Sequence, residues 1–138
     1  MQTYKELLKE GEKLNDTNFC SVVALSTLAD ISFKRAKRKL EKAGVRTHGA
    51  GADVMGFLKV LQNQGKTVSA IQVSGTMTAN QATKRFKTGK YFVVFNGSIC
   101  HCSALVNGKY NDWIDQSVRG KAPRYKIALI LKITDNNA

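Results

Sequence analysis

Three side chains that can act together as a thiol nucleophile, a base and an orienting carboxylate are spread along this sequence. Cys20 opens an apolar run, His101 lies in an extended apolar segment, and Asp112 follows one segment further on. A thiolate can attack a carbonyl carbon when an imidazole transfers the protons and a carboxylate holds that imidazole in place. These residue types therefore predict covalent thiol chemistry on an acyl group.

Cys20 is predicted to lie in the first turn of a buried helix. The helix spans about Phe19 to Ala29, is apolar on almost every face, and follows Asn18, a favourable N-cap residue. The N-terminus of a helix has unpaired N–H groups and about half a positive charge, which stabilise a thiolate. A nearby imidazolium would lower the thiol pKa further. The alternative is that Cys20 is only a small apolar side chain of the core.

The register of the two strands predicted to hold His101 and Asp112 follows from the turn between them. Asn107-Gly108 is typical of a two-residue type I′ turn, because both residues tolerate a positive φ. Such a turn pairs Val106 with Lys109, and side chains then alternate between the two faces of each strand. Asp112 is therefore predicted on the face of His101, one diagonal step away.

Two other residues are alternatives to Asp112. Asp115 points to the opposite face in this register, but a bulge or bend at the end of the strand would reverse that assignment. Asn111 is a weaker alternative. An Asp beside His101 would fix the tautomer of the imidazole and stabilise its protonated form.

The same alternation argues against a metal site. Cys100 and Cys102 point to the face opposite His101, so the three side chains cannot converge from one regular strand. Cys20 and His48 complete no zinc-ligand spacing. No metal and no other cofactor is predicted. His48, in a glycine-rich loop, is interpreted either as a substrate contact or as an exposed loop residue.

Helices are predicted in the first half of the chain and strands mostly in the second. The apolar spacing predicts helices near residues 3–13, 19–29, 32–43, 52–64 and 78–86, and strands near 67–73, 91–95, 98–106, 109–115 and 126–133. The chain is therefore expected to form one α+β domain over residues 1–138, with a helical N-terminal half packed on an antiparallel sheet. The last strands are expected to form a meander.

The chain is strongly basic, with 22 Lys and Arg against 10 Asp and Glu. The basic residues are densest from Lys34 to Arg46, which is either a solvated helix face or a contact for an acidic partner or nucleic acid. No apolar run approaches the roughly 20 residues of a membrane span, so no membrane association is predicted. Three cysteines are an odd number, which favours free thiols and a cytoplasmic location.

The order Cys, His, Asp, with Cys20 opening a helix and His101 beginning a strand, is similar to that of the papain-like superfamily. The Cys helix, the charged helix from Lys34 to Gly44, a glycine-rich loop and the segment from His101 to Asp115 resemble small papain-fold proteins encoded by bacteriophages. This similarity covers most of residues 15–118. The resemblance implies a papain-like cysteine protease or related hydrolase that acts on a protein or peptide in the cytoplasm of a host cell.

The sequence departs from the papain signature at two points. No Gly follows Cys20, and no Gln lies between residues 5 and 19, where a papain-type oxyanion donor would be expected. Asn15 or Asn18, together with the backbone N–H of Cys20, is therefore predicted to stabilise the oxyanion. These departures also leave open a catalytically inactive descendant that only binds.

Two functions from different classes follow. In the first, Cys20 attacks an amide or isopeptide carbonyl, His101 protonates the leaving amine, and water or a second amine resolves the thioester. In the second, the protein is a catalytically inactive basic binding module for nucleic acid or an acidic protein. The residues from Val22 to Ala43 resemble a helix-turn-helix, whose second helix would be the basic one.

Overall fold

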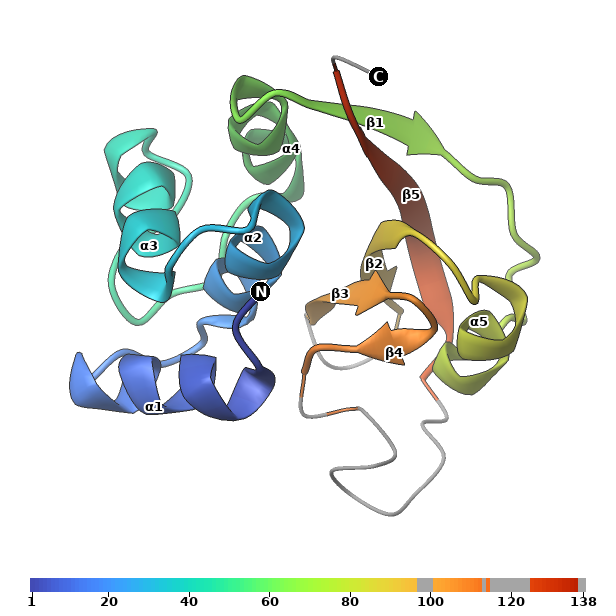
Figure 1. Cartoon of the computed structure of the whole chain (residues 1–138), viewed down its shortest axis with the longest axis horizontal. Helices are drawn as coiled ribbons and strands as arrows, with labels where there is room; N and C mark the ends of the chain where they lie inside the picture. Colours follow the sequence, from blue (N-terminus) through green and yellow to red (C-terminus); the bar gives the residue numbers. More distant parts are fainter. Residues whose placement is uncertain (97–100, 113, 115–124, 137–138) are drawn as a thin grey trace.

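The fold is that of a computed structural model that describes residues 1–96, 101–112, 114 and 125–136. Helices come first and most strands later (Figure 1), so the predicted α+β class is confirmed. The helices are α1 (Tyr4–Lys13), α2 (Cys20–Ala29), α3 (Phe33–Lys42), α4 (Val54–Asn63) and α5 (Ala79–Arg85). The strands are β1 (Lys66–Ala70), β2 (Lys90–Phe95), β3 (Cys102–Val106), β4 (Lys109–Tyr110) and β5 (Ile127–Asp135). None of the helices in these ranges is long and apolar enough to cross a membrane.

The five strands form one antiparallel sheet in the order β1-β5-β2-β3-β4. Strands β2, β3 and β4 form the predicted meander. The expectation that the meander continues into β5 is wrong, because β5 lies between β1 and β2. The physical reason is length. A two-residue β4 offers too few backbone groups to pair with a nine-residue strand, whereas β1 and β2 offer enough.

The turn between β3 and β4 has the predicted geometry. Asn107 and Gly108 have φ angles of 50° and 80°, as a type I′ turn requires. Val106 pairs with Lys109, which confirms the predicted register. Regular pairing ends at Tyr110, so β4 is shorter than expected. The turn and this register therefore fix the position of Asp112 relative to His101, which directly precedes β3.

Side-chain alternation along β2 divides the core into two layers. Phe92 and Val94 face α2 and α4, and the Phe92 ring stacks on Phe57 of α4 with centroids 4.5 Å apart. Val93 and Phe95 face the opposite layer, which α5 covers. Figure 1 shows α1 to α4 on one side of the sheet and α5 on the other. Helix α2, packed against β3, is buried from Ser21 to Leu28. The sheet therefore fixes the position of the helix that begins with Cys20.

The basic helix α3 begins at a side-chain cap, ends before a glycine with a left-handed φ, and buries one apolar face. The Ser32 hydroxyl accepts from the N–H of Arg35, and Gly44 has a left-handed φ of 71° just beyond the helix. Its apolar residues Phe33, Ala36 and Leu40 are buried, and the exposed basic residues are Lys34, Arg35, Arg38 and Lys42. The predicted basic cluster runs from Lys34 to Arg46, but Arg46 is buried and is not part of the exposed basic surface.

Candidate active site

A cleft of about 450 Å³ brings together Cys20, His101 and Asp112. Cys20 is the first residue of α2, His101 directly precedes β3, and Asp112 comes two residues after β4. The other residues that line the cleft are Tyr4, Asn18, Phe19, Val23 and Gly51. The structure thus gathers the three residues that the sequence predicts as nucleophile, base and orienter.

The imidazole of His101 is held by the residues around it. Nε2 forms a hydrogen bond with a carboxylate oxygen of Asp112, and both side chains are buried. The ring stacks on Phe95, with centroids 5.8 Å apart and planes inclined by 13°. The backbone of His101 accepts a hydrogen bond from the N–H of Phe95 at 3.0 Å. Because Asp112 occupies Nε2, Nδ1 is the ring nitrogen that can serve the thiol.

The surroundings of His101 favour its protonated form. Burial lowers the pKa of the imidazole, but hydrogen bonds to Asp112 and to Cys20 outweigh that effect and raise the pKa to about 9. At neutral pH the ring is therefore an imidazolium that can give a proton to a leaving group.

The Cys20 thiol is correspondingly acidic. A hydrogen bond from the Cys102 thiol, with the two Sγ atoms 3.7 Å apart, is the largest cause, and it lowers the pKa of Cys20 against the effect of burial. The hydrogen bond with His101 lowers it further, to about 4. Cys20 is therefore a thiolate at neutral pH and forms an ion pair with the imidazolium.

Cys102 is a residue of this site that the sequence analysis missed. Alternation places its side chain on the face opposite His101, as expected, and α2 with Cys20 covers that face of β3. His101 lies just before β3, where the alternation of a regular strand does not fix the direction of its side chain, and it also forms a hydrogen bond with Cys20. The signal in the sequence was the inward row of Cys102, Ala104 and Val106, which had to pack against the buried helix.

The N-terminus of α2 differs from the prediction in its cap. Phe19 is the N-cap residue, and among the described residues no side chain caps the helix. Asn18 has a left-handed φ of 52°, and its amide donates to the carbonyl oxygen of Gly49 at 2.9 Å. The backbone turn at Asn18 therefore directs its side chain to the glycine-rich loop instead of to the helix. Cys20 is thus the first residue of a helix whose N-cap side chain makes no capping hydrogen bond.

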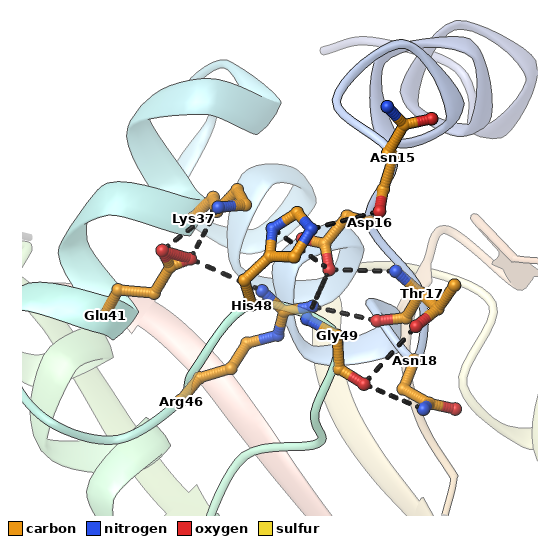
Figure 2. Close-up of polar contacts among 9 residues, drawn as sticks. All are labelled: Asn15, Asp16, Thr17, Asn18, Lys37, Glu41, Arg46, His48 and Gly49. Carbon is orange, nitrogen blue, oxygen red and sulfur yellow. Dashed lines mark hydrogen bonds and ion pairs between the residues drawn. The ribbon is translucent and has the colours of Figure 1, made fainter.

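Asn15 and Asn18, the two predicted oxyanion donors, take different positions. Asn18 lines the cleft. Asn15 is exposed, its carbonyl oxygen accepts from Nε2 of His48 at 3.0 Å, and its side chain points away from His48 (Figure 2). Of these two alternatives, Asn18 and not Asn15 is among the described residues that line the cleft. A left-handed φ of 54° at Asn15 turns the chain there and aims its amide outward.

A buried ion pair joins the loop before α2 to the glycine-rich loop. The Asp16 carboxylate accepts from Arg46 at 2.7 Å, from the N–H of Gly49 at 2.7 Å and from the N–H of Thr17 at 2.9 Å (Figure 2). Both charged side chains are fully buried. Burial alone would raise the pKa of Asp16, but these donors lower it overall. His48 of the glycine-rich loop is half exposed and contacts Asn15 and Asp16, so it also connects the glycine-rich loop to the loop before α2. The pair fixes the two loops that supply Asn18 and Gly51 to the cleft.

Arg46→Ala is expected to lower the free energy of unfolding by about 3–5 kcal/mol, because it leaves the buried Asp16 carboxylate without its cation. Urea denaturation measures the change. The matched control is Lys66→Ala, which breaks an ion pair with the largely exposed Asp135 and should cost less than about 1 kcal/mol. Equal losses in the two variants would contradict this role of the buried pair.

The remaining predicted positions are resolved as follows. Asn111 donates to the carbonyl oxygen of Gln2 and to the hydroxyl of Thr27, so it ties α2 to the N-terminus and does not orient His101. Asp115 and Cys100 lie outside the described residues. Within the described ranges, no group of three or more His, Cys, Asp and Glu side chains is arranged to hold a metal ion.

No model of a known protein family matches the chain, and neither a curated protein nor a solved structure matches it significantly.

Proposed function

We propose that this protein is a papain-like cysteine hydrolase or acyl transferase that acts on an amide or isopeptide bond. The observation on which this rests is that one cleft holds Cys20, His101 and Asp112, with Asp112 hydrogen-bonded to the His101 imidazole. The lowered pKa of Cys20 and the raised pKa of His101 favour a thiolate and an imidazolium in this arrangement. Strongly shifted pKa values of two partners in a cleft are typical of a catalytic site.

The proposed reaction begins with attack of the Cys20 thiolate on the carbonyl carbon. The C–S bond forms, and the carbonyl oxygen takes the electron pair and becomes an oxyanion. When the C–N bond breaks, the leaving amine takes its proton from the His101 imidazolium. Neutral His101 then accepts a proton from water or from a second amine, which attacks the thioester and releases Cys20.

Oxyanion stabilisation is proposed for the backbone N–H of Cys20 and the amide of Asn18. The first lies at the positive end of a ten-residue helix that begins at the nucleophile itself. The second lies in the cleft, fixed by its hydrogen bond to Gly49. One proton of the Asn18 amide is used in that bond, and the other is available to the oxyanion.

The alternative of a basic binding module explains less of the structure. In a helix-turn-helix the first helix crosses the nucleic-acid backbone, so it has to be accessible. Here α2 is buried from Ser21 to Leu28. Only the exposed basic residues of α3 offer a surface for an acidic partner in this alternative. A binding module would also have no need for a thiolate in a cleft.

Alkylation by iodoacetamide tests the proposed function through its pH dependence. With a pKa of about 4, Cys20 is fully thiolate above pH 5, so its alkylation rate should be constant from pH 5 to 8. An ordinary thiol, with a pKa of about 8.5, should react about a thousandfold faster at pH 8 than at pH 5. Peptide mapping by mass spectrometry measures the rate at each cysteine.

The control is Cys20→Ser, which should remove the pH-independent reaction and leave only the steep one. A Cys20 rate that rises tenfold per pH unit would overturn the proposed function, because the nucleophile would then be an ordinary thiol.

A further inference from the structure

A second thiol lies directly behind the proposed nucleophile. Cys20 lines the cleft, whereas Cys102 packs against the core between α2 and β3. The Sγ atoms are 3.7 Å apart, about 1.7 Å more than the roughly 2.05 Å of a disulfide bond. In the described part of the chain both cysteines are free thiols. A small oxidant entering the cleft would therefore meet Cys20 first and Cys102 second.

We propose that Cys20 and Cys102 form an oxidant-sensitive dithiol, which a peroxide converts to an intramolecular disulfide and a dithiol reductant restores. The site of modification is the Cys20 sulfur, and the oxidant class is hydrogen peroxide or a small alkyl hydroperoxide. The two thiols approach from α2 and β3, elements that pack directly on each other. A bond between them therefore requires side-chain rotation more than movement of the fold.

In the first step the Cys20 thiolate attacks the nearer oxygen of hydrogen peroxide. The S–O bond forms as the O–O bond breaks, so sulfur is oxidised to a sulfenic acid and the peroxide is reduced. The leaving hydroxide takes a proton from the His101 imidazolium and departs as water. The ion pair thus supplies both the nucleophile and the proton of this step.

In the second step the Cys102 sulfur attacks the sulfenic sulfur of Cys20. The S–S bond forms as the S–O bond breaks, and the hydroxide leaves as a second water with the proton that the Cys102 thiol gives up. The hydrogen bond to the Cys20 thiolate is the largest cause that raises the pKa of Cys102. Oxidation of Cys20 to a neutral sulfenic acid removes that cause, so the pKa of Cys102 falls once Cys20 is oxidised.

Disulfide formation rests on the distance between the two thiols and on the acidity of Cys20, and it does not depend on hydrolase activity. Its consequence for catalysis rests on the proposed function, because a Cys20 sulfur in a disulfide cannot attack a carbonyl carbon. The resting enzyme would then be protected against oxidation to the sulfinic acid, a state that common thiol reductants do not reverse.

The test uses the full chain with Cys100→Ser. This substitution is needed because no Lys or Arg separates Cys100 from Cys102, so trypsin leaves both on one peptide. Hydrogen peroxide at neutral pH should remove two thiols together, lower the mass of the single chain by two hydrogens, and join the peptide containing Cys20 to that containing Cys102. Dithiothreitol should then restore iodoacetamide labelling of Cys20 completely.

The matched control adds Cys102→Ser, which keeps a hydroxyl donor beside the Cys20 thiolate but cannot form a disulfide. In this variant dimedone should trap a sulfenic acid on Cys20, and excess peroxide should cause a loss of labelling that dithiothreitol does not reverse. The proposal is overturned if the parent chain gives no joined peptide, or if both chains recover equally. Hydrolysis of p-nitrophenyl acetate by the untreated parent chain separates the two hypotheses, because its absence would refute the proposed function without affecting the joined peptide.

Discussion

Cys20→Ala should abolish turnover of an activated ester such as p-nitrophenyl acetate. Wild type should release a burst of about one equivalent of p-nitrophenolate and bear an acetyl group on Cys20, because thioester formation precedes its hydrolysis. Without the Cys20 sulfur the proposed nucleophile is gone, and the rate should fall close to that of the uncatalysed reaction. Absorbance of p-nitrophenolate and the intact mass of the protein measure both outcomes.

His101→Ala should lower the same turnover by about 10⁴-fold or more, because the thiolate loses its cation and the thioester loses its general base. The pKa of Cys20 should rise, since the hydrogen bond and charge of His101 help to lower it to about 4. Alkylation of Cys20 at pH 5 should slow accordingly. Cys20→Ala combined with His101→Ala should be no slower than Cys20→Ala alone, because the two side chains act as one unit.

Ser21→Ala is the control for both variants. Ser21 is the neighbour of Cys20 in α2, and its buried hydroxyl has no hydrogen-bond partner among the described residues. Its removal should leave the burst and the turnover near wild type. If turnover survives Cys20→Ala while Ser21→Ala behaves as wild type, the activity belongs to another residue and the mechanism is wrong.

Local signals in the sequence were sufficient for the turn and the register that position His101 and Asp112. A positive φ at Asn107 and Gly108 is a requirement of the shortest hairpin, and it fixes the pairing of Val106 with Lys109. From that register Asp112 follows as the nearest carboxylate on the His101 face. The signals for the helices are also local, because the apolar spacing of a helix and a cap such as Ser32 lie within a few residues of each other.

Features that depend on contacts between distant segments could not be predicted. The pairing of β5 with β1 and β2 depends on the relative length of strands far apart in the chain. The ion pair of Asp16 with Arg46 joins two loops that the sequence separates by 30 positions. Cys102 meets Cys20 only because α2 packs on β3. Alternation gave the correct face for Cys102, but it contained no information on which helix covers that face.

Substitution of the orienting carboxylate should also have a large effect. Asp112→Asn should lower turnover by up to about 10⁴-fold, because an amide at this position can donate to Nε2 and so select the wrong tautomer of His101. It should also lower the pKa of His101, since the hydrogen bond and the charge of Asp112 raise it towards about 9. In the wild type His101 is protonated, and can donate its proton to the leaving group, below about pH 9. The alkaline limb of the turnover profile should therefore move to lower pH in the variant.

Asp115→Asn is the matched comparison, because Asp115 is the other carboxylate that the sequence places near this strand end. Its position lies outside the described residues, whereas Asp112 forms a buried hydrogen bond with the imidazole. Asp115→Asn should therefore leave the turnover rate and the alkaline limb near wild type. A large loss confined to Asp115→Asn would show that Asp115 orients His101 in the working enzyme and that Asp112 has a structural role.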